Sequence, residues 1–215
     1  FTGKHPGSDS RGELYNDDPV TQDARFCGTT ASMCGIEAAL FEKNDEKLKR
    51  GIREDLMLHA YMLTQSGIPM LYSSDEIGRL NDYSYKEDPD KAADSRYIHR
   101  GAFQWELAGK RKSKSSVEGQ IFQTLDRMEQ IRSQESVFDK DCDVYTYDVH
   151  DDSILCILRQ KGNDRFIGIF NFSDIEKTAW MQEEGTFRNL INGETLMLKD
   201  VVLPAYGFLW CKKCK

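Results

Sequence analysis

The first 138 residues alternate between apolar stretches with helical spacing and long polar stretches without periodicity. Apolar side chains recur every three or four residues over about 45–65 and again over about 117–131, which predicts two helices. The first carries acidic residues in its opening turn, and the second begins at a capping-box sequence, Ser115-Ser-Val-Glu118. A shorter helix is expected over about 30–42.

A continuous apolar run, Ile68-Pro-Met-Leu-Tyr72, follows the first long helix directly after Gly67. Glycine is typical of a helix C-terminus. A short run that is apolar on both faces fits a strand buried within a parallel sheet. A helix followed by such a strand is the repeating step of an α/β barrel or open sheet, so residues 1–138 are predicted to form an α/β domain.

The pattern changes after residue 138. Short runs of β-forming residues follow one another, separated by turns rich in Gly, Asn and Asp, and they predict a small antiparallel all-β domain over 139–215. The runs lie at 144–149, 153–159, 166–172, 187–191 and 205–210. The polar stretches 1–28 and about 73–114 exceed simple connections, and irregular loops of that length are usually functional or disordered.

Composition and charge disfavour nucleic-acid binding and a membrane-spanning protein. The 215 residues carry a net charge of −7, which disfavours nucleic acid as a partner. No apolar run reaches the length of a membrane span, no signal peptide is visible, and the start without Met suggests a piece of a longer protein. The six cysteines do not resemble a disulfide scaffold, so we expect a cytoplasmic protein. The single Cys211-Lys-Lys-Cys214 pair is short of the about four ligands of a zinc site, so no metal or cofactor is expected and this end is interpreted as a frayed tail.

Two adjacent acids, Asp75 and Glu76, follow the predicted strand. Active-site residues of barrel enzymes lie at the C-terminal ends of the strands. In an extended chain neighbouring side chains point to opposite sides, so these carboxylates are not expected to act together as an acid–base pair. One would face a cavity while the other anchors a loop; the alternative is that both bond to the local backbone.

A cluster of charged and aromatic residues occupies positions 94–105, with Arg96 and His99 near its centre. Sugar sites combine aromatic faces with charged groups that hold hydroxyls, and a guanidinium pairs with a carboxylate in a two-pronged geometry. The alternative is a loop anchored by salt bridges in which His99 is structural. Residues 23–29 precede a predicted helix, and taken alone they would be a capping segment with Arg25 on the surface.

These segments, in this order, resemble the last third of amylosucrase, a member of glycoside hydrolase family 13 in the α-amylase superfamily. Residues 68–78 resemble the eighth strand of the family's barrel and its Gly-Asp-Glu ending, with Ser74 where glycine is usual. Residues 23–29 resemble an Arg-X-X-Gly-Thr segment in the long loop after strand seven. The likeness covers nearly the whole chain.

The more discriminating part of the resemblance is a pair of loop motifs. Leu80-Asn-Asp82 is followed by Asp94-Ser-Arg96 and then by His99-Arg100, with Gly101 where proline is usual. This pattern resembles the sucrose-using members of the family, amylosucrase and sucrose hydrolase.

The resemblance implies the C-terminal part of a (β/α)8 TIM barrel over 1–138, followed by a small antiparallel β-sandwich over 139–215. By the family pattern Arg96 lies at the base of the sucrose pocket, where it pairs with an acid from an earlier barrel loop and contacts the glucosyl ring. Arg25 would border the neighbouring subsite, for fructose or an acceptor glucan. Four further residues would support the site: Asp94, His99, Asp75 and Glu76.

No catalytic residue is expected within this chain. The retaining mechanism that the resemblance implies needs a carboxylate nucleophile and a carboxylic acid about 5 Å apart. In the family these acids follow strands four and five, and a third follows strand seven in a His-Asp motif. His150-Asp151-Asp152 spells a similar triplet, but it falls in a predicted hairpin turn and is interpreted as coincidence. Because a (β/α)8 barrel takes about 250 residues, the isolated chain is expected to be inactive.

The resulting hypothesis is that the intact protein splits sucrose and transfers its glucosyl unit to a glucan or to water, with sucrose and α-glucan as partners. An α-amylase or α-glucosidase type of hydrolase is the alternative within the family. A non-catalytic carbohydrate-binding module is a further alternative, with Trp105, Trp180 or Trp210 as platforms, although Trp210 is expected to be a core residue. The last alternative is a scaffold that binds the remainder of the barrel or self-associates through exposed strand edges.

Overall fold

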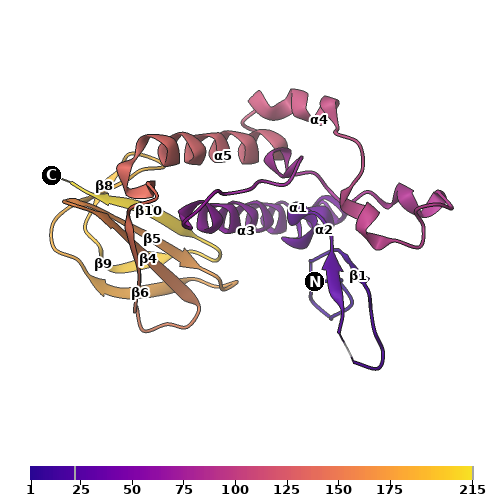
Figure 1. Cartoon of the computed structure of the whole chain (residues 1–215), viewed down its shortest axis with the longest axis horizontal. Helices are drawn as coiled ribbons and strands as arrows, with labels where there is room; N and C mark the ends of the chain where they lie inside the picture. Colours follow the sequence, from indigo (N-terminus) through magenta and orange to yellow (C-terminus); the bar gives the residue numbers. More distant parts are fainter. Residues whose placement is uncertain (22, 215) are drawn as a thin grey trace. The chain divides into compact units, whose positions relative to one another are not determined.

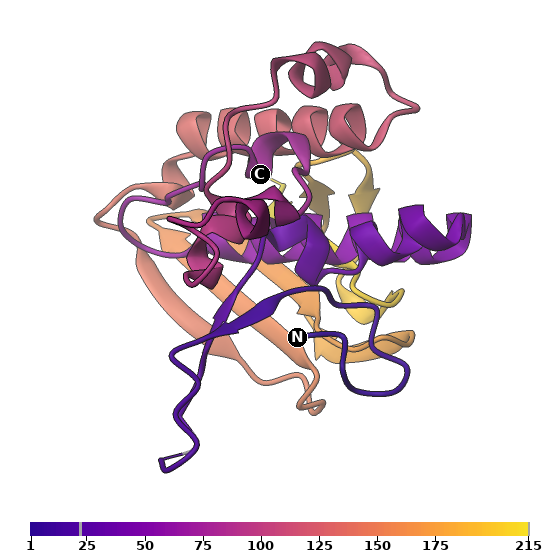
Figure 2. The same cartoon turned by 90° about the vertical axis from the view of Figure 1, so that its right-hand side faces the viewer.

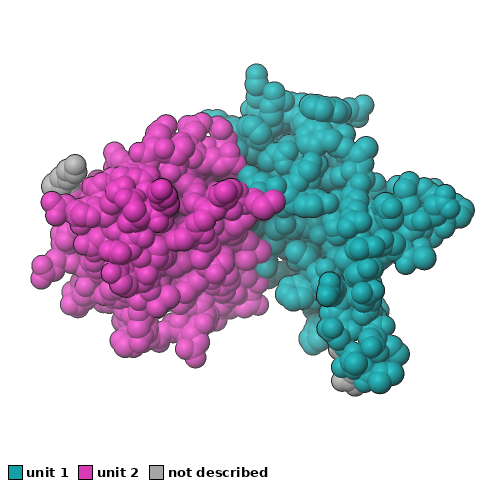
Figure 3. Space-filling view, in the orientation of Figure 1, with its two compact units in different colours: residues 1–55, 71–123 teal, residues 56–70, 124–215 magenta. Residues whose placement is uncertain are grey.

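The computed structural model describes residues 1–21 and 23–214, and the chain divides into two compact units (Figure 3). Unit 1 comprises residues 1–55 and 71–123, and unit 2 comprises residues 56–70 and 124–215. The two long helices each contribute residues to both units. The division after residue 138 that the sequence suggests concerns the domains of an intact protein, and it stays a prediction.

Unit 1 is built from short helical segments and one small hairpin (Figure 1). Its elements are β1 (Glu13–Tyr15), β2 (Arg25–Cys27), α1 (Thr30–Met33), α2 (Ile36–Glu42), η1 (Asp75–Ile77), η2 (Tyr83–Glu87), η3 (Ser95–His99), α4 (Trp105–Gly109), η4 (Lys110–Lys112) and the first turns of α3 (Asp45–Thr64) and α5 (Val117–Gln134). The strands β1 and β2 pair antiparallel, so the polar stretch 1–28 contains a hairpin that its sequence pattern does not reveal (Figure 2).

The two long helices lie where the apolar spacing predicts them. The α3 residues Ile52, Ala60 and Leu63 are buried. The α5 face is buried at every apolar position after its first residue: Ile121, Leu125, Met128 and Ile131. A sustained 3.6-residue period over several turns is the strongest helical signal that a single sequence offers.

Helix ends differ from the sequence expectation by small amounts. The helix expected over 30–42 is two helices, because Gly35 between α1 and α2 adopts a left-handed φ of 83°. The N-cap of α5 is Ser116 and not Ser115, since the Ser116 Oγ accepts from the Gly119 backbone N–H at 3.0 Å. The predicted capping box was therefore wrong by one residue.

The expected buried parallel strand at 68–73 is absent from the structure. Residues 68–72 take no part in a ladder within the described chain, and Ile68 and Met70 are 92% and 81% exposed. Every strand pair among the described residues is antiparallel. An extended apolar segment becomes a buried strand only when neighbouring strands supply hydrogen-bond partners and cover its faces, and this chain supplies none for 68–72.

Unit 2 contains an antiparallel sheet with the strand order β3-β4-β5-β10-β7-β8 and a separate two-stranded pair, β6-β9 (Figure 1). The strands are β3 (Asp143–Tyr147), β4 (Ile154–Lys161), β5 (Asp164–Asn171), β6 (Lys177–Gln182), β7 (Phe187–Asn189), β8 (Thr195–Leu196), β9 (Lys199–Leu203) and β10 (Phe208–Lys213). The antiparallel all-β prediction is confirmed, and the turn that holds His150 lies between β3 and β4 as expected. Three strands were not predicted: β6, β8 and β9.

Both faces of β5 are covered. Ile167 and Ile169 join the main apolar cluster of unit 2, which also contains Cys211. On the other face Phe166 packs against Trp210, which is completely buried. The interpretation of the Cys211–Cys214 end as a frayed tail was wrong, because β10 pairs with two strands and continues to Lys213.

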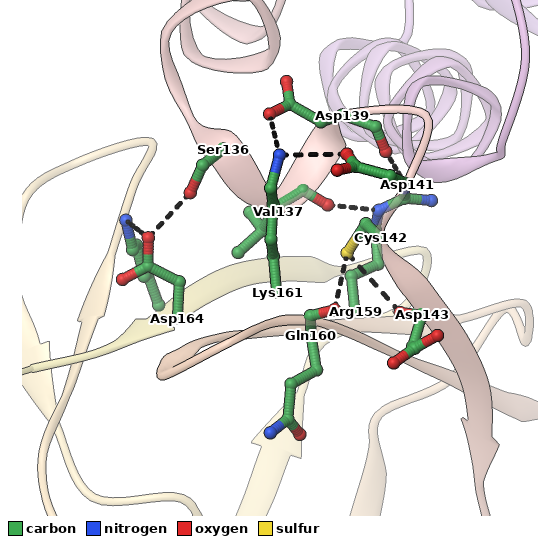
Figure 4. Close-up of polar contacts among 11 residues, drawn as sticks. Ser136, Val137, Asp139, Asp141, Cys142, Asp143, Arg159, Gln160, Lys161 and Asp164 are labelled. Carbon is green, nitrogen blue, oxygen red and sulfur yellow. Dashed lines mark hydrogen bonds and ion pairs between the residues drawn. The ribbon is translucent and has the colours of Figure 1, made fainter.

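A buried arginine, Arg159, donates hydrogen bonds to two backbone carbonyls in the interior of unit 2. Arg159 of β4 is 1% exposed, and its guanidinium donates to the carbonyl of Val137 at 2.6 Å and to that of Thr64 at 2.8 Å. It also lies over the ring of Phe138. Figure 4 shows the surrounding polar contacts, in which Lys161 bridges two aspartates near η5 (Ser136–Phe138).

Candidate functional site

A small apolar core in unit 1 lies within the segments that carry Arg25, Asp94 and Arg96. Cys27, Tyr85 and Ile98 are buried there, and Tyr15 and Tyr97 pack against them. They come from the β1–β2 hairpin, η2 and η3, which are distant in sequence. The core therefore joins the two long polar stretches, which the sequence could only describe as loops.

Asn81 joins the same segments by hydrogen bonds. Its Oδ1 accepts from the Thr29 backbone N–H at 2.8 Å, and its Nδ2 donates to the Arg11 carbonyl at 3.0 Å. Its own backbone N–H donates to the Ser32 Oγ at 2.9 Å. Only an amide side chain supplies a donor and an acceptor in this way. The middle residue of Leu80-Asn-Asp82 thus positions the loops, a role that sequence reasoning did not assign to it.

Arg96 lies in η3 and pairs with Asp94. The Arg96 Nε donates to the Asp94 Oδ1 at 2.8 Å and Nη2 donates to Oδ2 at 2.7 Å, the two-pronged geometry of a strong pair. The same Oδ1 caps η3 by accepting from the Arg96 backbone N–H. The guanidinium lies over Tyr15, 4.4 Å from the ring centre. The sequence resemblance implied that Arg96 pairs with an acid from an earlier barrel loop; in the structure its partner is Asp94 of the same loop, and the expected pairing with an acid outside this chain stays a prediction.

Arg25 lies on the same hairpin. It is the cross-strand partner of Tyr15, and directly opposite residues of an antiparallel pair project to the same face. The Arg25 side chain is exposed, as expected for a surface residue. The structure therefore brings Arg25, Asp94 and Arg96 to one side of the hairpin, around a tyrosine that the sequence analysis missed. A three-residue strand is too short to produce a periodic signal, so the pattern gave no indication of Tyr15.

The Asp94–Arg96 pair shifts the pKa of both groups toward stronger ionisation. Side-chain hydrogen bonds from Arg96 lower the pKa of Asp94 to about 2 from its ordinary value of 3.8, and the Asp94 carboxylate in turn raises the pKa of Arg96. Because the folded-state pKa of Asp94 is depressed, the stabilisation by this pair is present above pH 3.8 and is lost as the pH falls through about 2.

A pH titration tests this assignment. We expect the ¹³C shift of the Asp94 carboxyl carbon to titrate with a midpoint near 2 in the wild-type chain. In Arg96→Gln the midpoint should rise toward 3.8, because the neutral amide stabilises the carboxylate less. A wild-type midpoint near 3.8 would contradict the pairing.

Asp75 and Glu76 lie in the 3-10 helix η1 and not in extended chain, so the argument that they point to opposite sides was wrong. The Asp75 Oδ2 accepts from the Thr30 Oγ1 at 3.2 Å, which connects η1 to the first residue of α1. The backbone N–H of Gly78 donates to the Asp75 carbonyl and closes the turn. Asp75 therefore anchors a local turn, which is the role that the sequence analysis proposed for one of these two acids. The role of Glu76 stays a prediction.

Ser74 has a backbone conformation that favours glycine. Its φ is 81°, in the left-handed region, and its buried hydroxyl has no hydrogen-bond partner among the described residues. A side chain in this region costs about 1–2 kcal/mol, which gives a physical reason for the glycine that the family pattern expects here.

Replacing Ser74 tests this strain. We expect Ser74→Gly to be more stable than Ser74→Ala by about 1 kcal/mol in urea unfolding, because only glycine relieves the backbone. The Ala variant is the matched control, since both replacements remove the hydroxyl. Equal stability of the two variants would show that the positive φ carries no cost.

His99 lies at the end of η3 and is half-buried. Its ring meets the edge of Tyr72 at a centroid distance of 5.5 Å. Burial lowers the pKa of His99, and the charge of Arg100 lowers it further. Its Nδ1 has no hydrogen-bond partner among the described residues. A neutral histidine packed against a tyrosine agrees with a supporting role.

No three His, Cys, Asp or Glu side chains within 1–21 and 23–214 come together as a metal site would require. None of the helices in this described part of the chain has the length and apolarity needed to cross a bilayer.

No protein-family model matches the sequence. Solved structures do match the fold. A variant of AmyP in complex with maltotriose is 13% identical, covers 76% of this chain with a TM-score of 0.61, and is itself covered to 35%. A variant of the trehalulose synthase MutB in complex with sucrose is 16% identical, covers 74% of this chain with a TM-score of 0.57, and is itself covered to 38%. Another structure of MutB, from Pseudomonas mesoacidophila, matches with a TM-score of 0.55 at 14% identity.

These similarities show that the chain shares its fold with part of AmyP and with part of MutB, and the sheet within this fold is antiparallel. At this level of identity the similarity describes the fold alone. The chain spans little more than a third of the length of the solved chains it matches, 35% of AmyP and 38% of MutB.

Proposed function

We propose that this chain is the C-terminal part of a retaining glycoside hydrolase family 13 enzyme that splits sucrose and passes the glucosyl unit to a glucan or to water. The observation that carries the proposal is the Asp94–Arg96 pair, held over Tyr15 beside the exposed Arg25. The fold shared with MutB, whose structure with sucrose is solved, supports a sucrose-using member of this family.

Arg96 is suited to hold sugar hydroxyls. Asp94 accepts from Nε and Nη2, so the Nη1 donors can face a ligand. A guanidinium stays charged at every physiological pH and has no acceptor, so it recognises oxygen atoms. Its orientation is determined before a sugar arrives, which reduces the conformational entropy lost on binding. In this proposal Arg25, on the same hairpin face, borders the fructose or acceptor subsite.

The bond-breaking carboxylates belong, in this proposal, to polypeptide outside the chain. A retaining mechanism needs a carboxylate that attacks the glucosyl carbon and a carboxylic acid that protonates the departing fructose. Asp75, bonded to Thr30, has the role of a turn anchor. The intact enzyme would also supply strands on both sides of residues 68–72, which explains why Ile68 and Met70 are exposed here. Free cysteines throughout the chain fit a cytoplasmic location.

The first test measures fructose released from sucrose. We expect no release by the 215-residue chain and release by a longer protein that contains it. In this proposal the 215-residue chain supplies binding groups, and the retaining pair of acids belongs to other polypeptide. Fructose release by the 215-residue chain would overturn the assignment of the acids to other polypeptide.

An α-glucan hydrolase is the second candidate, favoured by the similarity to AmyP, which was solved with maltotriose and with maltose. The two candidates differ in the bond that is broken. Glucose or maltose released from maltotriose by the longer protein, without fructose release from sucrose, would select the hydrolase. The reverse result would select the sucrose-splitting enzyme.

A carbohydrate-binding module is tested separately. Trp210 is completely buried and cannot serve as a platform, whereas Trp180 is 56% exposed on β6. Trp105 is 79% exposed, and retardation of the chain in a gel that contains soluble starch, lost in Trp180→Ala or in Trp105→Ala, would favour this alternative.

A further inference from the structure

The buried guanidinium of Arg79 occupies the space where a side chain of residue 101 would lie, next to the proposed sugar-binding loop. Arg79 is 3% exposed, and its Nη1 donates to the carbonyl of Gly101 at 2.6 Å. Its Nη2 lies 3.6 Å from the Asp82 Oδ2. The Arg79 Nε and Nη2 have no hydrogen-bond partner among the described residues, so the backbone carbonyl of Gly101 is the main acceptor for this buried cation.

Glycine at residue 101 leaves room for the Arg79 guanidinium. A Cβ added at residue 101 would collide with the Arg79 Nη2 and with the Asp82 Oδ2. The φ of Gly101 is not in the left-handed region, so conformational freedom is not the reason for glycine here. A side chain at 101, including the proline that the family resemblance leads one to expect, would require the Arg79 guanidinium and the Asp82 carboxylate to move.

The arginine also fixes the backbone that carries Asp94 and Arg96. The Asp82 backbone N–H donates to the Ile98 carbonyl at 2.8 Å, so residues 79–82 bond to η3 at Ile98 and to the chain just after η3 at Gly101. Ile98 is completely buried in the small core of unit 1. Two hydrogen bonds therefore position the loop that carries Arg96: the one from the Asp82 N–H to Ile98, and the one from Arg79 to Gly101.

We infer that Arg79 and Gly101 are a coupled pair in which Arg79 acts as a positioning residue for the Asp94–Arg96 loop, and in which neither residue can be changed independently of the other. The coupling itself depends only on the geometry. Its relevance to sugar recognition rests on the proposed function.

The coupling is tested by a double-variant cycle in the full chain: Gly101→Ala, Arg79→Ala and the double variant. Two readouts are local, the exchange rate of the Asp82 amide hydrogen and the NMR signal of the Arg96 Nε–H, which is protected by Asp94. We expect Gly101→Ala to speed Asp82 exchange by at least about tenfold, and the double variant to return it to within about threefold of Arg79→Ala alone. Gly109→Ala is the matched control, because a Cβ there meets nothing within 4 Å, and it should change neither readout.

Rescue separates positioning from general destabilisation. If Gly101→Ala behaves like Gly109→Ala, or if its effect is undiminished in the Arg79→Ala background, the pair is not coupled and the inference fails. Neither readout requires a sugar. A coupled pair in a longer protein that releases no fructose would therefore reject the proposed function while the coupling stands.

Discussion

Replacing Arg159 by methionine is expected to lower the free energy of unfolding by about 3 kcal/mol. The guanidinium is buried and bonds to the carbonyls of Val137 and Thr64. Methionine fills much of the volume but leaves both carbonyls without this donor in an interior that water does not reach. Each buried acceptor that loses its partner costs about 1–3 kcal/mol. Urea unfolding, followed by the fluorescence of the buried Trp210, measures the difference.

Two further variants make this prediction specific. Arg159→Lys keeps the charge but has a single donor head, which cannot bond in two directions as a planar guanidinium does, so we expect most of the loss to remain. Arg188→Met is the matched control, because Arg188 is 56% exposed and lies 3.9 Å from Glu135, and it should change stability by less than about 0.5 kcal/mol. Equal effects at residues 159 and 188 would contradict the role of burial.

Arg159 also shows which part of the fold a sequence does not reveal. It follows the apolar run 154–158 and its sequence position suggests a charged strand end. Its guanidinium bonds to the carbonyl of Thr64 at the end of α3 and to that of Val137 within η5, which lie 95 and 22 positions away in the sequence. The residues around position 159 do not reveal these contacts, because the partners come close only when the whole chain is folded.

Elements with a sustained period were predictable. The helix α3 and the buried face of α5 repeat over several turns, and β4 and β5 are long apolar runs. The strand β8 was missed because two residues give too little pattern, and β6 and β9 were missed because each begins with a charged residue that interrupts the apolar pattern. The segment 68–72 failed for the opposite reason: its composition is that of a buried strand, but strand formation also requires neighbours.

The sequence proposed residues for the candidate site, and their roles in binding stay predictions; the contacts between them were not predictable. The Asp94-Ser-Arg96 spacing suggested a carboxylate and a guanidinium in one loop, and the structure pairs them. Two features of the site depend on tertiary contacts between segments far apart in sequence. Tyr15 lies beneath the Arg96 guanidinium, and Asn81 bonds to the Thr29 backbone. The extended conformation expected for Asp75 and Glu76 failed because the left-handed Ser74 turns the chain into η1.

In a longer protein that splits sucrose, Arg96→Lys is expected to lower kcat/KM for sucrose about 100-fold, or about 2.7 kcal/mol of transition-state stabilisation. Lysine keeps the charge, but its single ammonium group cannot bond to both Asp94 oxygens and also present a fixed donor to the glucosyl ring. The Arg96 side chain is 40% exposed, so the fold should survive the replacement, and an unchanged Tm would show that it does.

The matched control for Arg96→Lys is Arg100→Lys in the same loop. Arg100 is exposed and lies over the Tyr97 ring at 5.9 Å, without a carboxylate partner of the kind that Asp94 provides. We expect its replacement to change kcat/KM less than about threefold. If Arg96→Lys retained more than half of the wild-type kcat/KM, Arg96 would be an ordinary surface pair and the site would have to lie elsewhere. A 100-fold loss at residue 96 with little change at residue 100 would mean that the two-pronged pair with Asp94, and not the positive charge of the loop, determines how the sugar is held.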